Sequence, residues 1–171
     1  MRGFTVFETL ISILIFSIIT IALGLTVVAG KNALFSNDVP TQLRQNLLFA
    51  IVSLSRELRQ TAPAKTNIGT NSSSNSITLQ IPHDNNGDGS TVDATGNIEW
   101  GANITYARNG ANQLTRTQAG ITSIISSNIW ALQFTRPANE NNILQIDITA
   151  QGANNTGSWQ DTEQAIIKMR N

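Results

Sequence analysis

A single long apolar segment dominates the start of the chain. No charged side chain occurs between Thr9 and Gly30, and residues 10–29 are mostly Ile, Leu, Val and Phe. About 20 residues of α-helix rise roughly 30 Å, which matches the hydrocarbon thickness of a bilayer. The pattern therefore predicts a membrane-spanning helix over residues 4–30.

This segment does not fit a cleaved secretory signal. Such signals combine a basic start, an apolar stretch of about 7–15 residues and small residues at the cleavage site. Here the apolar stretch is longer, and Gly30-Lys31-Asn32 follows it. We therefore expect a retained anchor.

The next segment, residues 31–62, has the spacing of an amphipathic helix. Its leucines and isoleucine recur at intervals of three or four residues, which places them on one helix face. They are Leu43, Leu47, Ile51, Leu54 and Leu58. We expect this face to pack against a sheet rather than to bind a ligand.

Prolines mark both ends of the amphipathic segment. Asp38 and Pro40 indicate a kink or a restart of the helix, because aspartate caps helices and proline is tolerated in a first turn. Pro63 predicts the end of the helix, and the polar residues 63–75 predict a linker loop.

Residues 76–171 change to a period of two, which is typical of half-buried strands. Asn109-Gly110 favours a hairpin turn between two of them. Strands are predicted at 76–81, 103–108, 113–116, 129–134, 144–149 and 165–170. The fold class is thus predicted as α+β: a long N-terminal helix, transmembrane in its first half and amphipathic in its second, packed on an antiparallel β-sheet domain.

Composition removes several classes of function. The chain of 171 residues has 11 Lys+Arg and 11 Asp+Glu, so no basic field exists to attract nucleic acid. It has no cysteine and one histidine, His83, which excludes thiol catalysis, disulfides and Cys/His zinc sites. No G-x-S-x-G elbow or outstanding carboxylate pair occurs, and we expect no enzyme.

The residues before the apolar segment carry a family resemblance. A lone acid, Glu8, stands at the edge of the predicted span, where a charge usually has a partner. The stretch G-F-T-V-F-E-T-L, residues 3–10, resembles the class III signal of type IV pilins and type II secretion pseudopilins. The order of the whole chain, a span, an amphipathic helix and then a sheet, is similar to the pilin fold.

The resemblance implies a processing pathway. It implies that residues 1–3 are a leader, that a prepilin peptidase cuts after Gly3, and that the new amino-terminal Phe4 is methylated. It also implies that Glu8 pairs with the free amine of a neighbouring subunit, so that two costly buried charges offset each other. Val6-Phe7 departs from the more usual Leu-Ile of the family.

A second stretch narrows the resemblance to particular members of the family. L-S-R-E-L-R-Q, residues 54–60, resembles the corresponding stretch of minor pilins of the PilW type and of J pseudopilins, as does the order of the later strands. The resemblance implies a minor pilin in a pilus or its initiating tip complex, with a J-type pseudopilin of a type II secretion system as the alternative. A more remote alternative is a membrane-anchored β-rich carbohydrate- or calcium-binding module.

The same resemblance implies a location and partners. We expect a single-pass inner-membrane protein whose C-terminal domain lies outside the cytoplasm, and which after assembly is part of a pilus or a periplasmic pseudopilus. The expected partners are other pilin or pseudopilin subunits, the prepilin peptidase and an inner-membrane assembly platform.

One polar loop has the beginning of a calcium-binding pattern. Residues 84–89 read D-N-N-G-D-G, as at the start of an EF-hand loop, but Thr95 stands where a bidentate glutamate is expected. No cofactor is required by the sequence, and calcium is the one candidate ion. The alternative is a solvated turn of Asn, Asp and Gly. The candidate ligands are Asp84, Asn86, Asp88, Ser90 and Asp93.

Three tryptophans offer a platform for a sugar. Of Trp100, Trp130 and Trp159, the strand pattern predicts that Trp130 belongs to the core and that Trp159 is the exposed one.

Overall fold

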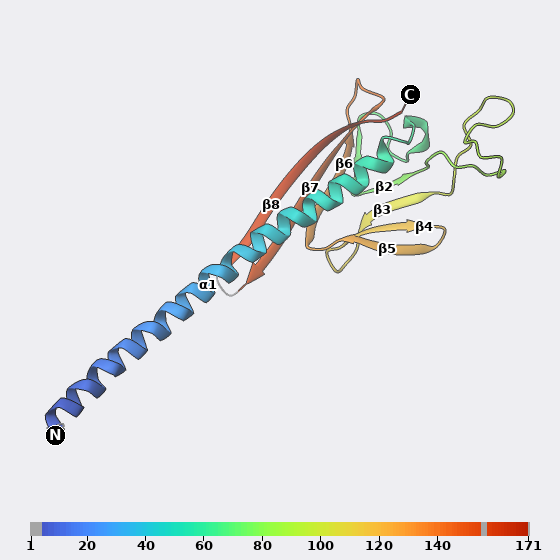
Figure 1. Cartoon of the computed structure of the whole chain (residues 1–171). Coiled ribbons are helices and arrows are strands. Elements are labelled where there is room, and N and C mark those ends of the chain that lie inside the picture. Colours follow the sequence, from blue (N-terminus) through green and yellow to red (C-terminus); the bar gives the residue numbers. More distant parts are fainter. Residues whose placement is uncertain (1–4, 155–156, 171) are drawn as a thin grey trace. The chain divides into compact units, whose positions relative to one another are not determined.

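The computed structural model describes residues 5–154 and 157–170, with side chains described for 5–31, 38–153 and 157–170. The chain divides into two compact units, Met1–Val39 and Pro40–Asn171, each of which is considered by itself. One helix, α1 (Val6–Leu58), contributes to both units (Figure 1).

The helix α1 continues through Pro40. The expectation that the helix restarts at this proline is therefore wrong. Proline removes one backbone hydrogen bond, and a long helix can retain the remainder.

The first unit is an apolar helix with no buried face. Its segment Val6–Lys31 has a mean hydropathy of 2.7 and none of its most apolar stretch is buried, so it is long and apolar enough to cross a membrane. Its hydroxyl groups bond to carbonyls one turn earlier: Ser12 to Glu8 and Ser17 to Ile13 at 2.8 Å each. Because these polar groups are satisfied within the helix, the outer surface is apolar in every direction.

The second unit contains the rest of α1 and two four-stranded antiparallel sheets. The first sheet has the order β1-β6-β7-β8 and the second the order β2-β3-β4-β5. The bounds of the strands are β1 (Ser72–Ser74), β2 (Ser76–Leu79), β3 (Ile104–Arg108), β4 (Leu114–Gln118), β5 (Ile121–Ser126), β6 (Ile129–Arg136), β7 (Ile143–Asn154) and β8 (Gly157–Lys168). The predicted α+β class is confirmed, with two sheets where the sequence indicated one.

One face of α1 in this unit forms the centre of the core. Its fully buried residues are Leu43, Leu47, Ala50, Leu54 and Leu58. The sequence analysis placed Ile51 in this row, but Ile51 is only half-buried and Ala50 takes its place. A period of 3.6 residues counted from Leu43 falls on position 50, where a small side chain lets the helix approach the sheets closely.

Contacts from α1 reach both sheets. Arg44 lies 3.7 Å from Asp161 of β8, and the Ser126 hydroxyl of β5 donates to the Asn46 carbonyl at 2.8 Å. Buried side chains from the two sheets, among them Phe134, Ile146 and Tyr106, complete the core. The helix therefore ties together two sheets that are separate in their hydrogen bonding.

The segment after the helix differs from the expected loop. The helix ends at Leu58, before Pro63, and a short 3₁₀-helix follows, η1 (Pro63–Lys65). Between the two, the Thr61 carbonyl accepts the Arg170 amide at 2.9 Å. Residues 72–74 within the predicted linker form strand β1, which pairs with β6. Polar composition alone suggested a loop, but a serine run can serve as an edge strand when backbone partners are present.

Candidate functional site

The amino end of α1 holds the acid that the sequence singled out. Glu8 is the third helical residue, and Thr5 immediately precedes the helix. The Glu8 amide donates to the Thr5 hydroxyl at 3.3 Å, and the Thr5 amide donates to Glu8 Oε2 at 3.4 Å. This is a capping box, encoded by the pattern T-x-x-E. Gly3 and Phe4, the predicted processing residues, lie outside the described residues.

Glu8 keeps unused acceptor capacity in the single chain. Both bonds that its carboxylate accepts from Thr5 end on Oε2, while Oε1 accepts none among the described residues. A carboxylate in the first turn also interacts favourably with the helix dipole. The acid therefore stabilises its own helix end and leaves one oxygen for another donor.

A second apolar surface lies on the outer side of α1 within the second unit. Leu48, Phe49 and Val52 are 51%, 61% and 64% exposed. Their helical positions are opposite the buried row that contains Leu47 and Leu54. Contiguous exposed apolar side chains mark contact surfaces. The sequence analysis missed this outer apolar face, although the adjacent Leu48-Phe49 and the i, i+4 pair Leu48–Val52 could have indicated it.

A polar cluster connects α1 with the second sheet. The Tyr106 hydroxyl of β3 donates to Glu57 Oε2 at 3.0 Å, and Arg116 Nη2 of β4 lies 2.9 Å from Glu57 Oε1. Burial, together with the negative charge of Glu57, holds the pKa of Tyr106 above its usual range. Burial opposes the charged form of Arg116, but the bond to Glu57 outweighs it and raises the pKa of that guanidinium. Glu57 thus accepts bonds from both Tyr106 and Arg116, and Arg116 Nη2 also donates to Gln118 Oε1 at 2.8 Å. A satisfied network of this kind is typical of a structural tether.

The candidate calcium loop is ordered by its own carboxylates. Asp84 accepts the amides of Gly87 at 2.7 Å and Gly89 at 2.8 Å, and these bonds lower the pKa of Asp84, Gly89 contributing most. Asp88 accepts the Ser90 amide at 2.8 Å, and the Asn86 side chain donates to Asp88 at 3.0 Å. Asx turns of this kind give the loop its shape without an ion.

The remaining candidate ligand belongs to a different turn. Asp93 accepts the hydroxyl of Thr95 at 2.7 Å and the amide of Asn97 at 2.8 Å, and these bonds lower its pKa. The acid that instead closes the loop is Glu99, which accepts the Asn85 amide at 2.6 Å. The sequence analysis missed Glu99, which stands beyond the spacing of an EF-hand loop. Over the described residues no three acidic or histidine side chains form a group suited to a metal, and calcium binding stays a prediction.

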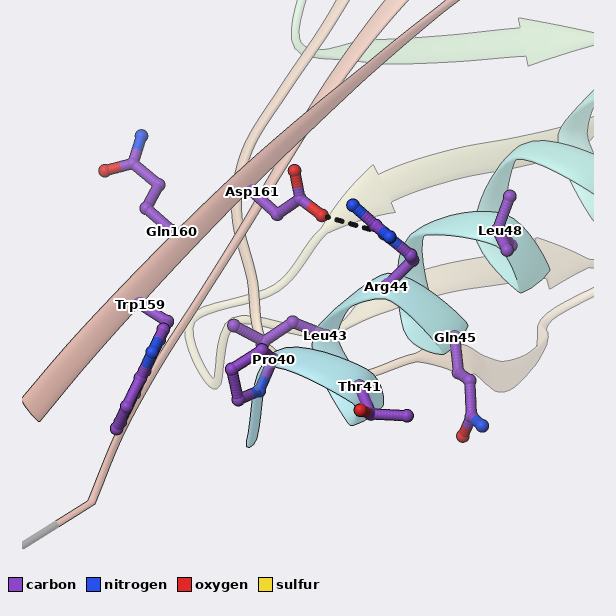
Figure 2. A pocket seen from close by; sticks show the side chains of 9 residues that line it. All are labelled: Pro40, Thr41, Leu43, Arg44, Gln45, Leu48, Trp159, Gln160 and Asp161. Carbon is purple, nitrogen blue, oxygen red and sulfur yellow. Dashed lines mark ion pairs between the residues drawn. The ribbon is translucent and has the colours of Figure 1, made fainter. Parts of the chain in front are cut away.

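Trp159 lines a groove between β8 and the start of the second unit's helix, shown in Figure 2. The groove encloses about 440 Å³ and is lined by Pro40, Leu43 and Leu48 from α1. Trp159 and Asp161 point from β8 toward the helix, and Gln160 points to the other side of the strand. Trp159 is half-buried, so the expectation that it is the exposed tryptophan is wrong.

The other two tryptophans also differ from expectation. Trp130, assigned to the core from its strand pattern, is 54% exposed. Trp100 is half-buried, and the Lys65 ammonium lies 5.4 Å from its ring centroid, a cation–π distance. The three tryptophans therefore differ in their exposure and in their neighbours.

No protein-family model, curated protein or solved structure matches this chain. An apolar N-terminal helix followed by antiparallel sheets is nevertheless consistent with a pilin-like fold. The apolar helix is a candidate membrane anchor or signal sequence.

Proposed function

We propose that the chain is a minor type IV pilin-like subunit that assembles through α1 into a pilus or its initiating tip complex. The observation that carries the proposal is the unburied apolar surface of Val6–Lys31, whose first turn is held by the Thr5–Glu8 capping box. A surface that is apolar on every side needs lipid or other apolar helices around it. A filament core made of such helices supplies that environment after the subunit leaves the membrane.

The amino end is proposed to be created by processing. A prepilin peptidase would cut after Gly3 and methylate Phe4, as the resemblance of residues 3–10 implies. Thr5 would then be the second residue of the mature chain, and the Thr5–Glu8 capping box would lie beside the new terminus. The capping box supports this proposal because it organises the helix from its first turn.

Glu8 is proposed to select its neighbour during assembly. Its Oε1, which accepts no bond from the described residues, would receive the free amine of a neighbouring mature subunit. Within an apolar surrounding, an uncompensated carboxylate is costly and a paired one is much less so. A subunit added in the wrong register would leave the charge unpaired.

The outer apolar face of Leu48, Phe49 and Val52 would extend the contact beyond the membrane. These side chains are 51–64% exposed, and covering the rest of their surface between subunits would add up to roughly 1.5 kcal/mol for each residue. The sheets would then face away from the helical bundle, toward other subunits or the surroundings.

The proposed location follows from the anchor. The subunit would rest in the inner membrane with its sheet domain outside the cytoplasm, in contact with the assembly platform. A J-type pseudopilin of a type II secretion system shares this arrangement. The two machines differ in where the assembled subunit is found: on fibres at the cell surface, or in a periplasmic pseudopilus.

The decisive experiment is intact mass and amino-terminal sequencing of the protein from its native membrane, with and without prepilin peptidase. We expect a peptidase-dependent start at methylated Phe4. A chain that begins at Met1 in both strains, or one that is cut near Ala29, would contradict the proposal.

Assembly is tested separately with Glu8→Gln, which keeps the shape of the side chain and removes its charge. We expect the variant to be processed and to enter the membrane but to be absent from filaments. Ser12→Ala is the matched control, because the Ser12 hydroxyl bonds only within its own helix at 2.8 Å. Filaments that contain Glu8→Gln at the normal level would rule out the pairing role.

A further inference from the structure

Strand β6 presents an indole at an irregularity in its pairing with β7. Ile129 pairs with Ala150 and Ala131 pairs with Thr149, so Trp130 is the extra residue of a β-bulge. A bulge redirects a side chain from the regular pleat and is common beside functional sites. Trp130 consequently stands on the surface of a strand whose other large apolar residues, Ile129, Leu132 and Phe134, are buried.

Three separate segments form a shallow pocket around this indole. They are the turn between β3 and β4, the connection before β6, and strand β7. The pocket encloses about 300 Å³, at the lower end of the range for small-ligand sites. Its lining consists of Asn112, Asn128, Trp130, Gln151, Gly152 and Ala153.

The backbone of the pocket is fixed by two asparagines in the left-handed region. Asn112 has φ 56° and Asn128 has φ 63°. The Asn112 carbonyl accepts the Ile129 amide at 2.8 Å, and the Asn128 carbonyl accepts the Gln151 amide at 2.9 Å. These bonds join the three segments, so the pocket is organised before any ligand arrives, which lowers the entropic cost of binding.

The side chains of the pocket offer hydrogen bonds that the protein leaves unused. Asn112 Oδ1 accepts a bond from Arg108. Asn128 and Gln151 make no side-chain hydrogen bond within the described part of the chain. Each free amide provides both a donor and an acceptor. None of the six lining residues carries a charge, and the Arg108 guanidinium beside the pocket is bonded to Asn112.

The geometry points to a binding site for a neutral saccharide at Trp130. One face of a sugar ring presents C–H groups that stack on an indole, while its hydroxyls both donate and accept. The indole supplies the stacking surface, and the amides of Asn128 and Gln151 supply the matching polar groups. The volume accommodates about one sugar ring of a longer glycan. This inference is independent of the proposed role in assembly.

The test is a titration of the detergent-solubilised full chain with a panel of neutral mono- and disaccharides. Binding is followed by NMR through the indole N–H of Trp130 and the side-chain amides of Asn128 and Gln151. A small open site predicts Kd values of about 1 mM. Trp130→Ala should weaken the best ligand at least tenfold, Gln151→Ala by a smaller factor, and Trp159→Phe in the separate groove should leave it unchanged.

Two results would overturn the inference. One is the absence of any shift in these three resonances at sugar concentrations well above the millimolar range. The other is equal affinity for wild type and Trp130→Ala, with the variant's backbone spectrum otherwise preserved.

Discussion

The two parts of α1 use the same kind of residue for different purposes. In Val6–Lys31 the leucines and isoleucines are exposed on all sides of the helix. In the second unit, the row containing Leu47 and Leu54 is fully buried against the sheets, and Leu48 on the opposite side is half exposed. An apolar residue therefore stabilises the domain in one place and is left on the surface in the other. Local composition does not distinguish these roles, but the angular distribution around the helix does.

The strongest way to separate the two roles is to truncate one leucine of each kind. Leu54→Ala removes a fully buried side chain and should lower the free energy of unfolding by about 2–5 kcal/mol, since a cavity remains. Leu48→Ala, on the same helix, should change it by no more than about 0.5 kcal/mol. Chemical denaturation of the detergent-solubilised chain measures both. Equal losses would mean that the outer face also belongs to the domain's core.

The next test concerns the polar tether of the second unit. Glu57→Ala removes the carboxylate that Arg116 and the Tyr106 hydroxyl share, and we expect a loss of about 1–3 kcal/mol in unfolding free energy. The neighbouring Arg56→Ala removes an exposed side chain and should be nearly neutral. A double-mutant cycle with Arg116→Gln should show coupling above about 0.5 kcal/mol. Additive losses would mean that Glu57 and Arg116 act separately.

The two parts of α1 also show how much of the fold could be predicted from the sequence. Periodicity found the helix, the buried row and most strands, because one-sided burial imposes a period of 3.6 or 2. It chose Ile51 over Ala50, since a hydrophobicity pattern rewards the larger side chain, whereas close packing of the helix requires the smaller one.

Other differences between the predicted and the observed structure come from strand pairing and from β-bulges. Strand β5 was not predicted, because its Ile121 and Ile124 are exposed and follow no inward alternation. Trp130 was assigned to the core from a regular pleat, and the bulge at this position reverses that assignment. Both depend on contacts between distant segments, which no local pattern contains. At the candidate sites, Glu8 was found from a motif, whereas Glu99 and the outer apolar face depend on three-dimensional placement.

A smaller effect is expected at the amino end of α1, where, among the described residues, Thr5 caps the first turn. Thr5→Ala removes the hydroxyl that accepts the Glu8 amide and should destabilise the first turn by about 1 kcal/mol, while Thr5→Ser should retain it. Amide hydrogen exchange at residues 6–9 in micelles measures this local stability. The second unit should be unaffected, which distinguishes the two parts of the helix. Unchanged exchange in Thr5→Ala would show that the capping box contributes nothing in a lipid-like surrounding.

The smallest effect is expected in the loop of residues 84–99, which acidification should loosen without disturbing either part of α1. The folded-state pKa values of Asp84 and Asp93 lie below the ordinary 3.8, because amide and hydroxyl donors favour their charged forms. Their contribution is therefore present above the unfolded pKa and is lost as the pH falls through the lowered folded values. The protection of the Gly87 and Gly89 amides, taken as their exchange rate relative to an unprotected amide at the same pH, should fall only below about pH 3.8. The protection of the helix should stay constant over the same range. Asp84→Asn should produce the same loosening at neutral pH, since the amide loses the charge that strengthens both bonds. Because both carboxylates are fully exposed, global stability should hardly change, and a large drop at this pH would place the critical acid outside this loop.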